Sequence, residues 1–116
     1  MGSQFELEHI GIAAGGGEEA ERLSLLLGRL FNLPVRHGKK SEFAGGYFEC
    51  MRLPGPGTHG HIALRTLDLT AAVAELEGKG VSFDLSTAAY GEDGRLTNIY
   101  LNGEFAGFAI HILQKE

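Results

Sequence analysis

The feature that most constrains the fold is a short pattern that occurs twice, a histidine placed at the head of an apolar run. Residues 7–12 read LEHIGI, and residues 59–64 read HGHIAL. His9 and His61 are 52 positions apart, and each run is followed by an amphipathic helix pattern and by further strand-like segments. The repeat indicates a duplicated unit with one histidine leading each half.

The first half predicts a strand, a helix and further strands. Residues 5–13 alternate with a period of two, which places His9 on one face and Ile10 and Ile12 on the other. Residues 18–31 predict a helix, because their leucines recur at the spacing of a single helical stripe. The stripe consists of Leu23, Leu26, Leu27 and Leu30. Further strand signals lie at residues 35–38, 41–43 and 47–53.

The second half repeats this order after the proline and glycine run at 54–57, which is the strongest chain breaker in the sequence. A strand is predicted at 59–66 and a helix at about 68–77, followed by strands at 81–85, 95–101 and 107–113. We therefore expect one α+β domain, residues 4–116, made of two βαβββ modules at 4–54 and 58–116. Since one helix covers only one face of a sheet, the two modules would bury their other faces by forming an incomplete barrel.

Charge and composition exclude several classes of partner. The chain has 10 basic and 15 acidic residues and a formal net charge of -5, which argues against nucleic acid or an anionic membrane as a partner. No run approaches the roughly 20 apolar residues of a membrane-spanning helix. The single cysteine, Cys50, cannot form an internal disulfide, so we expect a cytoplasmic protein.

Strand phase places four possible metal ligands on the predicted inner face: His9, Glu49, His61 and His111. Such side chains are costly on a concave inner face unless they are paired or bind metal. Three imidazoles and one carboxylate suit zinc, iron, nickel or manganese, and the sequence does not choose among them. Each residue also has a plainer interpretation: a lone histidine on a strand is more often hydrogen-bonded or on the surface, and Glu49 could pair with Arg65. His59 competes with His61 for the second position. The duplication favours a shared metal site.

Other polar residues face the same groove if strand phase holds. Arg65, Asn98 and Tyr100 could bind a carboxylate or hydroxyl of a small ligand, or could be ordinary polar residues of the barrel. Cys50 is out of phase with Glu49, so we expect it to point toward the helix as a small apolar filler.

The four strand motifs resemble those of the vicinal oxygen chelate superfamily, which includes glyoxalase I, methylmalonyl-CoA epimerase and extradiol dioxygenases. The matching segments are residues 8–12, 47–51, 60–64 and 107–112. The resemblance implies a glyoxalase-like fold, a divalent metal held by His9, Glu49, His61 and His111, and a substrate chelated through two neighbouring oxygens. Glyoxalase I and the epimerase usually carry a carboxylate at the last position, where this chain has His111.

A closer resemblance is to the small glyoxalase-like domain associated with 2-dehydro-3-deoxyphosphogluconate/4-hydroxy-2-oxoglutarate aldolases. Residues 43–45, 60–63, 98–101 and 107–111 carry it, and that domain also ends in a histidine. It implies a possible aldolase partner, although the aldolase barrel with its Schiff-base lysine is not part of this chain. The family also implies a homodimer, with the site either within one chain or across two.

These observations lead to two hypotheses. The first is a metal-dependent lyase or isomerase that acts on a small oxo acid or sugar acid by proton transfer through an enediolate. Glu49 would be the catalytic base, with His111 as the second candidate. The alternative is an accessory domain that binds a keto-acid metabolite and works with a separate aldolase.

Overall fold

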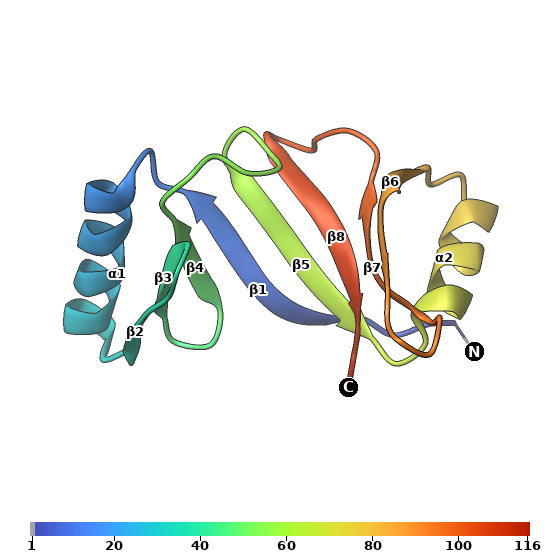
Figure 1. Cartoon of the computed structure of the whole chain (residues 1–116), viewed down its shortest axis with the longest axis horizontal. Coiled ribbons are helices and arrows are strands. Elements are labelled where there is room, and N and C mark those ends of the chain that lie inside the picture. Colours follow the sequence, from blue (N-terminus) through green and yellow to red (C-terminus); the bar gives the residue numbers. More distant parts are fainter. Residues whose placement is uncertain (1) are drawn as a thin grey trace.

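The computed structural model describes residues 2–116 and consists of one open, curved sheet with a helix near each end (Figure 1). The elements, in chain order, are β1 (Glu6–Ala13), α1 (Gly17–Phe31), β2 (Val35–His37), β3 (Ser41–Ala44), β4 (Phe48–Met51), β5 (Gly60–Thr66), α2 (Leu69–Gly78), β6 (Phe83–Tyr90), β7 (Leu96–Leu101) and β8 (Phe108–Gln114). The βαβββ order therefore occurs twice, as predicted. Within residues 2–116, neither helix has the length and apolar character needed to cross a membrane.

The sheet has eight strands in the order β2-β3-β4-β1-β5-β8-β7-β6. Within each half, the first and last strands pair in parallel, β1 with β4 and β5 with β8. A parallel pair needs a crossover connection, and the helix of each half supplies part of it. The two halves meet where β1 pairs antiparallel with β5. Because β2 and β6 lie at opposite ends of the order and do not pair, the sheet stays open, which confirms the incomplete barrel.

Helix α2 covers the main apolar core. Asp68 caps its first turn, accepting a hydrogen bond from the Ala71 amide at 3.1 Å. Leu69 on the helix packs with Phe83, Ile99 and Ile112 from the sheet, and all four are buried. Val73 and Leu76 pack against the same core, so one apolar side of the helix faces the sheet.

Helix α1 does not bury the face that its leucine stripe predicts. Its buried residues are Ala20 and Ser24, whereas Leu26 and Leu30 are 52% and 63% exposed. The helix packs on β3 and β4, which are strands of only four residues each. Small side chains let it approach them closely, and the larger leucines are left at the edge of the contact and beyond it.

Strand β6 extends beyond the strand predicted at residues 81–85, because residues 86–90 continue it to Tyr90. The register with β7 shifts between Asp84 and Ala89. Thr87 helps to hold this irregular stretch: its hydroxyl donates to the Asp84 carbonyl at 2.7 Å and accepts from the Tyr100 amide at 2.9 Å. Such hydroxyl-to-backbone bonds are not visible in the period-two pattern.

Candidate metal centre

Strand register brings side chains from both halves together in two neighbouring rows on one face of the sheet. Opposite residues on paired strands share a face. The first row runs from β2 to β5 through Arg36, Phe43, Glu49, Gly11 and His61. The second runs from β1 to β7 through His9, Ala63, His111 and Tyr100. The four predicted ligands therefore belong to adjacent rows, with small residues between them.

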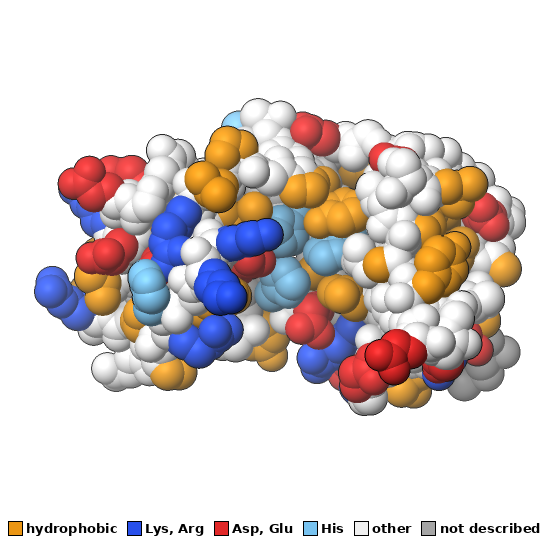
Figure 2. Space-filling model, in the orientation of Figure 1, with side chains coloured by type: hydrophobic (Ala, Val, Ile, Leu, Met, Phe, Trp, Pro, Cys, Tyr) orange, Lys and Arg blue, Asp and Glu red, His pale blue; other side chains and the backbone are white. Residues whose placement is uncertain are grey.

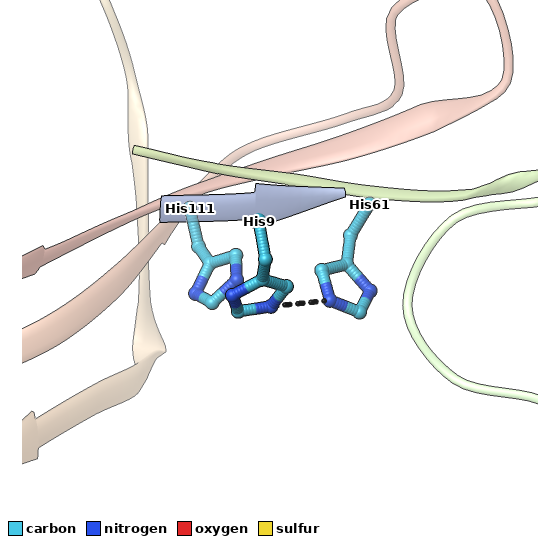
Figure 3. Close-up of side chains that lie close together, drawn as sticks. All are labelled: His9, His61 and His111. Carbon is cyan, nitrogen blue, oxygen red and sulfur yellow. Dashed lines mark hydrogen bonds between the residues drawn. The ribbon is translucent and has the colours of Figure 1, made fainter. Parts of the chain in front are cut away.

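The three histidines converge (Figure 3). The Nε2 atoms of His9 and His61 are 3.1 Å apart, and one ligand nitrogen from each of the three rings lies within 4.8 Å of the others. Several donors that share one metal at bonds of about 2.1 Å would lie about 3.0–3.4 Å from each other. A group of histidine side chains lies in the middle of the face shown in Figure 2. The distance between His9 and His61 falls in this range, and His111 presents a third nitrogen to the same place.

Glu49 joins this cluster through one oxygen. Its Oε1 lies 3.3 Å from His9 Nε2 and 3.4 Å from His61 Nε2, and its Oε2 accepts a hydrogen bond of 2.8 Å from the Ser41 hydroxyl. Hydrogen bonds from His61 and His9 hold the pKa of Glu49 far below its usual range, although partial burial opposes this. The carboxylate is therefore charged at neutral pH and presents a negative oxygen to the two imidazoles.

His111 is oriented by its neighbours on β7. Its Nδ1 lies 2.7 Å from Asn98 Oδ1, and because an amide oxygen only accepts, Nδ1 carries the proton. Nε2 is then the lone-pair nitrogen, and it is buried without a partner among residues 2–116. Burial, with smaller effects of His61 and His9, lowers the pKa of His111 to about 4. Tyr100 stacks on the ring, with centroids 4.4 Å apart and planes 8° from parallel. A neutral imidazole with a fixed tautomer and an unpaired buried nitrogen has the properties of a metal ligand.

Gly11 provides the space that His61 occupies. A Cβ atom added at Gly11 would lie 2.1 Å from Cε1 of His61 and 2.5 Å from each ring nitrogen. The imidazole therefore lies directly over the glycine backbone in the same register pair. A glycine inside a strand often marks such a close approach, and this is the signal by which the sequence could have revealed the role of Gly11.

A β-bulge in β1 changes the phase expected for the N-terminal residues. The register with β5 shifts between Leu7 and His9, so Glu6 pairs with Arg65 and Glu8 is left without a register partner. The Glu8 side chain nevertheless reaches Arg65. Arg65 approaches Glu8 at 3.2 Å and Glu6 at 3.4 Å. The structure thus gives Arg65 carboxylate partners on β1, and its predicted role in substrate binding stays a prediction.

The remaining candidates lie outside the histidine cluster. His59 lies against Gly107 and Phe108, while His61 is 5% exposed inside the cluster. Cys50 is fully buried in register with Glu42 and Ile12, and so behaves as the expected filler. Its pKa is raised by burial and by the charge of Glu49.

Three grooves are relevant to ligand binding. A groove of about 520 Å³ is lined by Glu8 and by the predicted substrate-binding residues Arg65 and Asn98. Another, of about 340 Å³, lies beside His9 and is also lined by Glu8, Arg36, Phe43 and residues 45–48. A larger one, of about 540 Å³, runs along α1 and is lined by leucine, arginine and glutamate side chains of that helix. Among these grooves, only the one beside His9 is lined by a candidate metal ligand.

Comparison with known proteins identifies the fold. No protein-family model matches the sequence, and no curated protein matches it. Among solved structures, a hypothetical protein, BH1468, from Bacillus halodurans C-125 has a TM-score of 0.65 at 18% identity, covering 97% of this chain and 96% of its own. Methylmalonyl-CoA epimerase from Mycobacterium tuberculosis has a TM-score of 0.66 at 16% identity, with coverages of 95% and 87%.

A third neighbour is a single-residue variant of methylmalonyl-CoA epimerase from Streptomyces coelicolor, in complex with 2-nitronate-propionyl-CoA. Its TM-score is 0.61 at 18% identity, covering 94% of this chain and 96% of its own. At these identities the likeness concerns the fold. The chain therefore has the mixed α+β, glyoxalase-like fold of its epimerase neighbours, with an open eight-stranded sheet.

Proposed function

We propose that the chain is a metal-dependent enzyme of the glyoxalase-like type that transfers a proton at the carbon next to a carbonyl group. The observation that carries the proposal is the convergence of His9, His61 and His111, with a buried and unpaired Nε2 on His111. Buried polar atoms are rarely left unpaired in proteins. A metal ion would satisfy this nitrogen without any change in topology.

The three histidines would hold the metal, and Glu49 would be the fourth ligand. Zinc, iron, nickel and manganese all suit this donor set. When bound, such a metal polarises a carbonyl oxygen and acidifies the adjacent C–H bond. Ser41 and Asn98 would keep the donor atoms of Glu49 and His111 in place through the hydrogen bonds described above.

Glu49 is also our candidate for the base. Its second oxygen is fixed by Ser41, and the carboxylate is ionised and adjacent to the groove that contains His9. Its lowered pKa makes it a weak base in the metal-free protein. His111, the second candidate, also has a lowered pKa and would use its one lone-pair nitrogen for the metal, so Glu49 stays the first choice. Tyr100 stacked on His111 would limit the access of water to that ring.

The proposed substrate is a small oxo acid or sugar acid, and the proposed reaction is an isomerisation. Two of the neighbours described above are epimerases, and they do not favour the alternative of an accessory domain for an aldolase. A homodimer and an aldolase partner stay predictions from the sequence.

The test combines metal loading with proton exchange. Chelator-treated protein is titrated with zinc, iron, nickel and manganese, and the loaded forms are incubated in D2O with a panel of 2-oxo acids while NMR follows exchange at the carbon beside the carbonyl. We expect one metal per chain and accelerated exchange. Glu49→Gln should lower exchange at least about 100-fold, whereas the exposed control Glu92→Gln should not. Protein that takes up no metal, or Glu49→Gln with full exchange, would contradict the assignment.

A further inference from the structure

The groove beside His9 contains a cation that the sequence pattern does not single out. Arg36, on the edge strand β2, lines this groove together with His9 and Phe43. Its guanidinium carbon lies 4.1 Å from the centroid of the Phe43 ring. Register places Arg36, Phe43 and Glu49 in one row on three successive strands. The cation therefore faces the same side of the sheet as the proposed metal ligands.

Arg36 has no carboxylate partner among residues 2–116. The acid that shares its groove, Glu8, is engaged by Arg65 at 3.2 Å. Figure 2 shows that basic side chains gather on one side of the histidines, over the end of the sheet that holds β2 to β4. The groove thus combines one candidate metal ligand, His9, with an arginine that has no carboxylate partner among residues 2–116.

We propose that Arg36 binds a second carboxylate of the substrate, which makes the substrate an oxo acid with two acid groups. The inference rests on the proposed function, because the oxo end of the molecule would lie at the metal. Arginine recognises carboxylates through two parallel hydrogen bonds, and stacking on Phe43 would hold the plane of the guanidinium for this purpose.

The distances fit a short diacid. Arg36 and Glu49 are two strands apart, which corresponds to about 10 Å between their Cα atoms. The arginine side chain and a five-carbon diacid can span this distance together. The turn formed by Gly45 and Gly46 borders the same groove, and a Cβ added at Gly46 would meet no atom within 4 Å. The groove that Arg36 lines is therefore open at Gly46, which leaves room there for part of a ligand.

The test uses two ligands that differ only in the remote group. Zinc-loaded protein is titrated by calorimetry with 2-oxoglutarate and with 2-oxopentanoate, which has a methyl group in place of the second carboxylate. We expect the wild type to bind 2-oxoglutarate about tenfold or more tightly. Arg36→Met keeps an apolar stem on Phe43 and removes the charge, so the preference should disappear while 2-oxopentanoate binding stays unchanged. Arg36→Lys should keep part of the preference.

The control is Arg29→Met, which removes an exposed arginine of α1 outside this groove and should leave the preference intact. A wild type without preference, or Arg36→Met with the full preference, would overturn the role of Arg36 and leave the proposed function standing. Failure to take up zinc, seen before any oxo acid is added, or failure of the zinc-loaded protein to bind either oxo acid, would overturn both.

Discussion

Substitution of Gly11 by alanine should disable the metal centre without adding or removing any ligand. The new methyl group would lie 2.1 Å from Cε1 of His61, whereas an ordinary contact needs 3.4 Å or more. The ring must therefore move by about 1.3 Å, the difference between these two distances. Metal-to-ligand distances in sound sites vary by only about 0.2 Å. His61 cannot keep its place in the ligand set after such a shift.

The size of the effect follows from this displacement. Changes to groups that only support a ligand cost about 10–100-fold in metal affinity, and here the ligand itself moves. We expect zinc affinity to fall at least about 100-fold. Gly11 does not have a positive φ, so alanine is compatible with its backbone, and alanine within a strand gains roughly 0.5–1 kcal/mol over glycine. The metal-free variant should therefore fold.

The assay is zinc competition against a chromophoric chelator, with circular dichroism to verify folding. Gly78→Ala is the matched control, since its Cβ would meet no atom within 4 Å and its φ is not positive. The His61→Ala background provides a second check, because Gly11→Ala should cost nothing further once the ring is gone. A folded Gly11→Ala protein with wild-type zinc affinity would refute the reasoning.

Two further predictions concern His111 and its partner. Asn98→Leu removes the acceptor that fixes the tautomer of His111, so zinc affinity should fall about 10–100-fold in the same competition assay; unchanged affinity would mean that the bond at 2.7 Å does not orient the ring. The metal-free protein should lose stability on acidification from about pH 6.5, because the pKa of His111 is lowered from 6.5 to about 4. The lowered pKa of Glu49 adds a further loss below its ordinary value of 4.5. The unfolded chain then binds more protons, so stability is full above about pH 6.5 and falls toward pH 4, by at most about 3 kcal/mol from His111. Urea unfolding across this range should show a smaller loss in His111→Asn, and equal slopes would contradict the assignment.

The positions of the candidate ligands could be predicted because they depend on period-two phase within single strands. His61 and His111 lie in regular strands, so their faces follow from the pattern of Ile62 and Ile112 beside them. The prediction of two βαβββ units rests on the same kind of local signal, repeated. Both kinds of prediction succeed where backbone geometry is regular.

The remaining features depend on tertiary contacts. The bulge in β1 lets both Glu6 and Glu8 reach Arg65, and no periodicity rule anticipates a one-residue shift. Ser41 belongs to a weak strand signal that assigns it no role, and only the pairing of β3 with β4 brings it to Glu49. The position of Arg36 could not be predicted, because a three-residue edge strand is too short for its alternation to show which face each side chain lies on.

The pairing of β1 with β5 has a consequence for the thermodynamics of the whole molecule. Each half supplies two of the four proposed ligands, His9 and Glu49 from one and His61 and His111 from the other. Metal binding and cohesion of the two halves are then linked equilibria. Any perturbation that separates β1 from β5 would lower the affinity for the metal. A bound metal would oppose that separation by the same free energy. A fragment with only one half would carry two of the four proposed ligands. The complete site would therefore require both copies of the duplicated unit in this chain.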